Sequence, residues 1–302
     1  MNIANKFFYT VLAALLSVAM TACGDEFVSE PTASYVQTDS GKTSVVSVSP
    51  LQSDTADDEK ISPPQYELNA NQIFEGKNGT VHYSYYLPEN YDESKKYPLV
   101  MTMPGYDMMW FGEASAGSNL KWTGFTAWTK FDTEMIVVSA QLTDWYETSA
   151  KQAVELTEYF IGNFSVDADR IYAAGYSAGG ETMSRAASIR PDLYAAYLHG
   201  ASQWDGTYDT IAENKVAVYI YMAEGDEYYG SDKARSAYDS LHKAYKDAGY
   251  SDAEINTFLR LEIPDNKFFN EKGIYNYHGG ANILFDDESN LDWIISHSKG
   301  EQ

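Results

Sequence analysis

Ser177 lies in a Gly-Tyr-Ser-Ala-Gly stretch whose residue types suit nucleophilic catalysis. An apolar run over residues 170–174 precedes it, and a small-residue segment over 178–189 follows and is typical of a helix. A serine at a sharp strand-to-helix turn needs small neighbours, because its backbone is strained. The same pattern also occurs in glycine-rich turns that pack a helix on a sheet. The rest of the chain must therefore decide whether Ser177 is a nucleophile.

A nucleophilic serine needs a donor for the oxyanion that forms when it attacks. The amide of Ala178 stands at the start of the predicted helix, where a backbone N–H and the helix dipole favour negative charge. Phosphate binding is the competing interpretation of such a turn, but the chain contains neither a Gly-x-Gly-x-x-Gly motif nor a Walker lysine. We therefore expect Ala178 to donate to an oxyanion.

The serine also needs a base, and the chain has five histidines. His278, in Tyr-Asn-Tyr-His-Gly-Gly-Ala-Asn, falls in a loop after the last predicted strand, and we expect it to be the base. His199 ends a predicted strand after the serine, and we expect it to line the substrate pocket. The remaining histidines lie in a predicted hairpin, within a predicted helix and near the chain end: His82, His242 and His297.

The acid that orients such a base should follow the strand over residues 216–222. Gly-Asp-Glu occupies its carboxyl end, where catalytic groups of parallel sheets collect. A carboxylate there holds the imidazole in the tautomer that accepts the serine proton. We favour Asp226 for this role, and Glu227 and Asp265 stay open as alternatives.

Strands that alternate with helices are predicted to position these groups. Turn residues 76–79 lie between two alternating segments, which indicates a hairpin. Short apolar runs indicate strands buried on both faces, and a helical pattern separates several of them. The pattern predicts an α/β fold with a mostly parallel sheet, helices on both faces, and one domain over residues 65–302.

The first residues predict export. Lys6 precedes an uncharged run over residues 7–23, which is too short to span a bilayer and ends in small residues. Met-Thr-Ala-Cys at its end resembles a lipoprotein lipobox, so we expect a signal peptide over 1–23, lipidation of Cys23 and a location in the cell envelope, with exposure at the cell surface as one alternative. Residues 24–64 are polar and aperiodic, which predicts a flexible tether.

Composition limits the partners. A formal charge of −23 and a pI near 4.4 argue against nucleic acid, which needs a basic surface. Cys23 is the only cysteine, so no disulfide forms within the chain. We expect no cofactor and no metal, because no histidine pair has the spacing of metal ligands.

Three stretches together resemble a known group of enzymes: residues 167–180 (DADRIYAAGYSAGG), 201–206 (ASQWDG) and the end of the chain (YHGGAN and DWIISH). They are similar to secreted α/β-hydrolase esterases related to polyhydroxybutyrate depolymerases, which include feruloyl and acetylxylan esterases of carbohydrate esterase family one. The resemblance implies the α/β-hydrolase fold and the triad Ser177, Asp226 and His278. It also implies hydrolysis of acetyl or feruloyl esters on polysaccharide.

The chain departs from this group at the second oxyanion donor. The group has His-Gly after the relevant strand, whereas this chain has Met-Pro-Gly-Tyr, so we expect the amide of Gly105 or Tyr106 to serve instead. For substrate contacts we expect Trp145 and Trp204, with core packing as the alternative. The competing functions are a prolyl-oligopeptidase-like peptidase and a non-catalytic glycan-binding lipoprotein.

Overall fold

The computed structural model describes residues 36–39, 42–45, 67–110, 115–143 and 146–299. The chain divides into two compact units, Met1–Ile61 and Ser62–Gln302. In the first unit, β1 (Val36–Asp39) and β2 (Lys42–Val45) pair as an antiparallel ribbon. These strands lie inside the predicted tether, where the sequence shows no periodic pattern. The predicted signal peptide and Cys23 lie outside the described residues.

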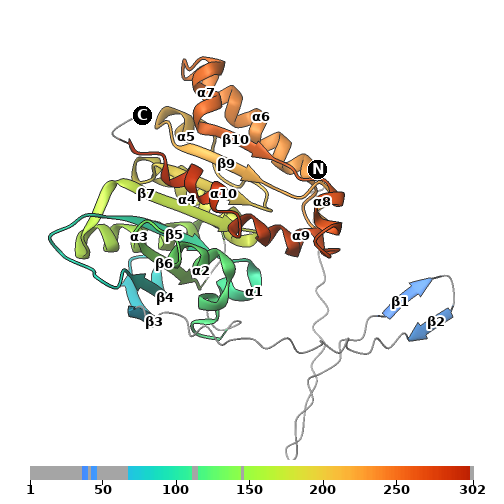
Figure 1. Ribbon diagram of the computed structural model, residues 1–302, viewed down its shortest axis with the longest axis horizontal. Coiled ribbons are helices and arrows are strands. Elements are labelled where there is room, and N and C mark those ends of the chain that lie inside the picture. Colours follow the sequence, from blue (N-terminus) through green and yellow to red (C-terminus); the bar gives the residue numbers. More distant parts are fainter. Residues whose placement is uncertain (1–35, 40–41, 46–66, 111–114, 144–145, 300–302) are drawn as a thin grey trace, which may run out of the picture. The chain divides into compact units, whose positions relative to one another are not determined.

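The second unit is built on one eight-stranded sheet with the order β10-β9-β8-β7-β5-β6-β4-β3 (Figure 1). The strands from β10 to β6 are parallel, whereas β4 pairs antiparallel with both β6 and β3. The predicted hairpin and the predicted mostly parallel sheet are confirmed. The strands are β3 (Glu67–Gly76), β4 (Gly79–Leu87), β5 (Tyr97–Met103), β6 (Ile136–Gln141), β7 (Val166–Tyr176), β8 (Ala196–Gly200), β9 (Ala217–Tyr221) and β10 (Leu259–Glu262).

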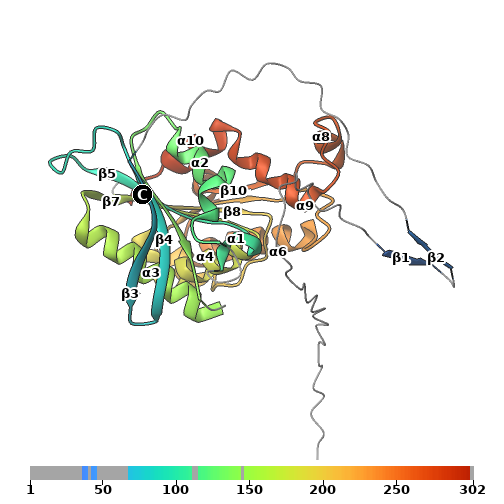
Figure 2. The same cartoon turned by 90° about the horizontal axis from the view of Figure 1, so that it is seen from below.

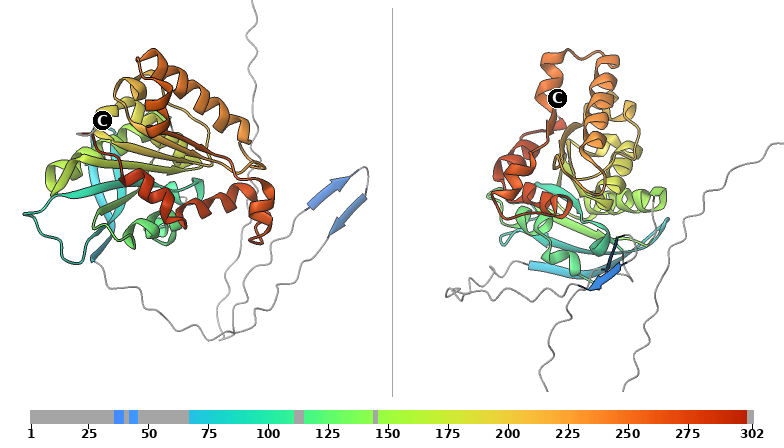
Figure 3. Two further views of the ribbon diagram at one scale, coloured as in Figure 1. Left: turned by 45° about the horizontal axis from the view of Figure 1, so that its top comes forward. Right: turned by 90° about the vertical axis from the view of Figure 1, so that its right-hand side faces the viewer.

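Helices cover both faces of this sheet. Figure 2 shows α3, α4 and α6 on one side and α2 and α10 on the other, and the right-hand view of Figure 3 shows the same two layers from another direction. The helices are α1 (Tyr106–Met109), α2 (Thr123–Thr129), α3 (Tyr146–Asn163), α4 (Ala178–Ile189), α5 (Asp209–Glu213), α6 (Ser231–Asp247), α7 (Asp252–Phe258), α8 (Asn266–Asn270), α9 (Tyr277–Gly280) and α10 (Glu288–Ile295).

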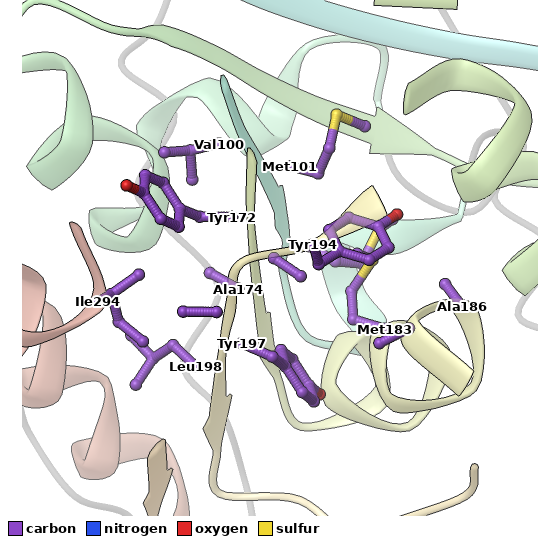
Figure 4. Packing of buried hydrophobic residues seen from close by; sticks show 14 of the residues in the cluster. Val100, Met101, Tyr172, Ala174, Met183, Ala186, Tyr194, Tyr197, Leu198 and Ile294 are labelled. Carbon is purple, nitrogen blue, oxygen red and sulfur yellow. The ribbon is translucent and has the colours of Figure 1, made fainter. Parts of the chain in front are cut away.

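The central strands are buried because apolar side chains on both of their faces pack against helices. Every residue of β5, β6, β8 and β9 is buried. Figure 4 shows Tyr197 of β8 beside Met183 of α4, and Leu198, its neighbour on the other face, beside Ile294 of α10. Burial of each such side chain stabilises the fold by about 1.5–3 kcal/mol. The strand ends that carry the site are thus held by a packed core.

Helix α7 and strand β10 follow one another directly in the chain. Helix α7 extends through Phe258, and β10 starts at Leu259. A capping box of Ser251 and Glu254 explains this helix, since each side chain pairs with the other residue's backbone N–H. Among the described residues, no helix is long and apolar enough to cross a membrane.

Candidate active site

Ser177 occupies a strained turn between β7 and α4. Its backbone has φ 54° and ψ −125°, a conformation that few residues other than glycine adopt. Close packing explains the small neighbours. A Cβ at Gly175 would lie 2.6 Å from the carbonyl oxygen of Gly179, and a Cβ at Gly179 would lie 2.3 Å from that of Met103. The sequence therefore folds into a sharp turn that presents the serine at the end of the sheet.

His278 lies 101 residues after Ser177 in the sequence but contacts it in the fold. Its Nε2 lies 3.0 Å from the serine Oγ, and its Nδ1 lies 2.7 Å from Oδ2 of Asp226. The histidine belongs to the short helix α9, which Asn276 caps by accepting a hydrogen bond from the N–H of Gly279. The three side chains thus form one hydrogen-bonded chain of acid, base and hydroxyl.

Two backbone amides hold Asp226 in place by donating hydrogen bonds to the carboxylate oxygen that does not contact His278. Oδ1 accepts hydrogen bonds from the N–H of Tyr228 at 3.0 Å and of Tyr229 at 2.7 Å, and the carboxyl side chain is fully buried. Burial by itself would raise the pKa of Asp226. The hydrogen bonds from His278 and from these two amides outweigh it and hold that pKa below its ordinary value. The residue therefore stays ionised and can stabilise an imidazolium.

The two alternative acids, Glu227 and Asp265, bind backbone N–H groups and do not contact the imidazole ring. Glu227 accepts the backbone N–H of Tyr277 at Oε1 and of His278 at Oε2, both at 2.8 Å, so it holds the loop that carries the histidine. Burial would raise the pKa of Glu227, but these two amides lower it. Asp265 caps α8 by accepting the N–H of Phe268 at 2.8 Å. Only Asp226 among the three faces the imidazole ring.

A cavity of about 490 Å³ opens over Ser177. Its lining is aromatic and acidic, and it contains no lysine or arginine among the described residues. Glu181, from the first turn of α4, is only 6% exposed, and its Oε1 accepts the hydroxyl of Tyr229 at 2.7 Å. The lining consists of Gly105, Tyr106, Asp107, Met108, Trp122, Tyr176, Ser177, Ala178, Glu181, Tyr228, Tyr229, Asn276, His278, Gly279 and Asn282.

The loop after β5 lies against the serine. A Cβ at Gly105 would be 3.5 Å from the Cβ of Ser177, which is ordinary van der Waals contact. Gly105, Tyr106 and Ala178 all line the cavity. The backbone that the sequence marks for oxyanion donors is therefore gathered around the hydroxyl.

Comparisons with known proteins agree with this geometry. A sequence model of the Prolyl oligopeptidase family matches residues 139–251, which include Ser177 and Asp226 but end before His278. No curated protein matches the chain. The fold is the α/β-hydrolase fold, and Ser177, His278 and Asp226 have the arrangement of a serine hydrolase triad.

Solved structures share the fold of this chain at low sequence identity. A thermostable esterase has a TM-score of 0.61 at 19% identity, with 76% of this chain and 63% of that chain covered. A putative dipeptidyl aminopeptidase IV from Bacteroides ovatus has a TM-score of 0.55 at 15% identity, with 76% of this chain and 36% of that chain covered. A feruloyl esterase module from Clostridium thermocellum, complexed with sinapinate, has a TM-score of 0.50 at 16% identity, with 82% of this chain and 95% of that chain covered. This chain thus spans less than two thirds of the length of the first two structures.

Two of the three expected substrate contacts do not line the cavity. His199 is fully buried within β8, where its Nδ1 pairs with the hydroxyl of Tyr197 at 2.7 Å and its Nε2 with the carbonyl oxygen of Ser202 at 3.2 Å. Burial lowers the pKa of His199 to about 4. The prediction for His199 is therefore wrong, because every residue of its strand points into the core. Trp204 packs on the rings of His199 and Tyr208, away from the cavity, and Trp145 lies outside the described residues.

The sequence prediction missed several aromatic residues of the cavity. The hydroxyl of Tyr176 donates to the carbonyl oxygen of His278, and Nε1 of Trp122 donates to Oδ1 of Asn282 at 2.7 Å. Tyr228 follows the acid almost directly in Gly-Asp-Glu-Tyr-Tyr-Gly, and this proximity was a usable signal. Trp122 had none, since it reaches the site from a segment far from every motif.

Proposed function

We propose that this protein is a serine hydrolase, and more narrowly a serine esterase that works through an acyl-enzyme. The observation that carries the proposal is the unbroken path from Ser177 Oγ to His278 Nε2 (3.0 Å) and from His278 Nδ1 to Asp226 Oδ2 (2.7 Å) beneath an open cavity. Ser177 attacks the ester carbonyl while His278 takes its proton and then gives it to the leaving alcohol. A water, deprotonated by the same imidazole, releases the acid.

The oxyanion is proposed to bind two backbone amides. Ala178 supplies one, since the first amides of a helix have no partner within it. Tyr106, directly after the glycine that touches Ser177, supplies the other, with Gly105 as the alternative donor. A backbone donor needs no particular side chain, so Met-Pro-Gly-Tyr can replace the His-Gly of similar esterases.

An aromatic acyl group fits the cavity better than acetyl. Five aromatic side chains line it, and 490 Å³ falls in the range of sites that enclose drug-sized ligands. An acetyl group would leave most of that volume to water. Asp107 and Glu181 would repel an acyl group that carries its own carboxylate. We propose feruloyl-type esters on polysaccharide, and the sinapinate-bound feruloyl esterase of the same fold supports this choice.

The test compares methyl ferulate with ethyl acetate as substrates. We expect kcat/KM to be at least tenfold higher for methyl ferulate and Ser177→Ala to abolish both activities. Wild-type activity that persists in Ser177→Ala would overturn the proposed nucleophile. A higher kcat/KM for ethyl acetate would overturn the acyl assignment alone.

A peptidase is the second candidate, because the family model and the Bacteroides ovatus neighbour carry peptidase names. Hydrolysis of aminoacyl anilides faster than methyl ferulate would favour it. A non-catalytic glycan-binding protein is the third. Labelling with a fluorophosphonate separates it, since a binder without catalysis would not be modified at Ser177.

We also propose that the hydrolase is exported and lipid-anchored at Cys23 in the cell envelope. The proposal rests on the Met-Thr-Ala-Cys motif that ends the uncharged N-terminal run. Incorporation of an alkynyl palmitate analogue in cells should label the wild type, and Cys23→Ser should remove the label. Equal labelling of the two would overturn the anchor.

A further inference from the structure

A second cavity adjoins the first on the histidine side. It has a volume of about 390 Å³ and is lined by five residues, Glu227, Tyr228, Tyr275, Asn276 and His278. Three of these, Tyr228, Asn276 and His278, also line the cavity over the serine. The two cavities therefore meet at the imidazole.

The chemistry of the proposed reaction decides what each cavity holds. When the acyl-enzyme forms, the bond between the acyl carbon and the alkoxyl oxygen breaks, and the proton taken from Ser177 passes from His278 Nε2 to that oxygen. The leaving oxygen must therefore lie within hydrogen-bond reach of His278. The acyl carbonyl points instead toward Ala178 and Tyr106. Of these two cavities, both lined by His278, the first also contains Ala178 and Tyr106, whereas the second contains neither, so we assign the second to the alcohol.

The walls of the second cavity are flat and aromatic. Tyr228 is 74% exposed and Tyr275 73% exposed, the two highest values among the exposed large hydrophobic residues of the described chain. The ring of Tyr228 stacks on the imidazole of His278, with centroids 5.3 Å apart and an interplanar angle of 30°. One face of each tyrosine is thus available to a ring that has apolar C–H faces.

Polar groups occupy the rest of the wall. Each oxygen of Glu227 accepts one backbone N–H and keeps a further lone pair, and Asn276 uses its Oδ1 as a helix cap while its Nδ2 carries donors. Within the described part of the chain, the lining contains no aliphatic side chain, lysine or arginine. These walls suit a ring with apolar faces and hydroxyl edges. They do not suit a fatty alcohol, which needs an apolar channel, or an anionic alcohol, which Glu227 would repel.

We propose that the second cavity is a sugar subsite, in which Tyr228 and Tyr275 stack on the sugar that carries the ester and Glu227 and Asn276 bind its hydroxyls. This inference rests on the proposed esterase function and assigns the alcohol half of its substrate. The two backbone hydrogen bonds that Glu227 accepts fix its carboxylate, so little ordering of that side chain is needed when the sugar binds.

The experiment compares two esters with one acyl group, methyl ferulate and feruloyl arabinose. We expect Tyr275→Ala to lower kcat/KM about three- to tenfold more for feruloyl arabinose than for methyl ferulate, mainly through KM, as is usual for one aromatic contact. Tyr275→Phe should keep the wild-type preference, because stacking needs the ring only. Tyr146→Ala serves as a matched control, since that tyrosine is also exposed but lines neither cavity.

Two outcomes would overturn the subsite: a wild type that shows no preference for feruloyl arabinose, or a Tyr275→Ala variant that keeps the wild-type ratio between the two esters. Both can occur while methyl ferulate is still hydrolysed through Ser177. Loss of the subsite is therefore distinguishable from loss of the proposed function, in which neither ester is cleaved.

Discussion

Replacing Asp226 by asparagine tests the proposed mechanism most directly, because the structure fixes how the new side chain must lie. Oδ1 of Asp226 accepts the N–H groups of Tyr228 and Tyr229, so the amide oxygen of the asparagine must take that position. Its NH₂ group then faces Nδ1 of His278, now 2.7 Å from Oδ2. That nitrogen must accept, which moves the ring proton to Nε2.

With a proton on Nε2, the imidazole of His278 cannot take the proton of Ser177. Nucleophile activation fails, and we expect kcat to fall about 10⁴-fold, which corresponds to about 5.4 kcal/mol of transition-state free energy. The fold should persist, since both backbone donors keep an acceptor. We therefore expect the melting temperature of Asp226→Asn to stay within a few degrees of the wild type.

Steady-state hydrolysis of methyl ferulate measures the loss, with calorimetry on the same samples. Asp226→Ala is the matched variant. It should lose comparable activity but also about 1 kcal/mol of stability, because it leaves the part-buried amides of Tyr228 and Tyr229 without their acceptor. A kcat for Asp226→Asn within tenfold of the wild type would refute the assigned tautomer and, with it, the role of this acid.

Three further predictions concern neighbouring positions. Glu227→Gln should lower kcat about 10- to 100-fold, since an amide cannot accept both backbone N–H groups that hold the histidine loop; a loss as large as that of Asp226→Asn would make Glu227 the acid. His199 has a folded pKa of about 4, below its unfolded value of 6.5, so the stability it contributes is complete above pH 6.5 and is lost as pH falls toward 4. The full effect is about 3 kcal/mol, and denaturant unfolding of His199→Gln should lack this pH dependence while the wild type shows it. Gly179→Ala should destabilise the fold by more than about 2 kcal/mol, because its Cβ would meet the carbonyl oxygen of Met103 at 2.3 Å, whereas Gly105→Ala should cost less than about 1 kcal/mol; similar melting temperatures for the two would contradict the packing argument.

Local sequence was informative where one element decides its own conformation. The hairpin of β3 and β4 was predicted from the turn residues between them, and β5 from its largely apolar run. Helix α4 begins at Ala178 and ends at Ile189, as predicted. Burial of His199 was missed because a histidine that ends a strand looks the same in sequence whether its ring enters a pocket or the core. Its contacts with Tyr197 and Ser202 exist only once β8 is packed.

The sequence by itself determined the strand-turn-helix around Ser177, the order in which serine, acid and histidine follow one another, and the mostly parallel sheet. Each of these follows from residue size, hydrophobic period and turn chemistry over a few neighbours. Tertiary structure alone decided that Asp226 faces the imidazole while Glu227 holds its loop, that Trp122 reaches Asn282, and that Tyr228 and Tyr275 flank a second cavity. The physical reason is that the hydrogen bonds among these residues join positions 50 to 160 residues apart, for example 52 between Asp226 and His278 and 160 between Trp122 and Asn282. A local sequence pattern does not determine which of such distant side chains come into contact in the folded protein.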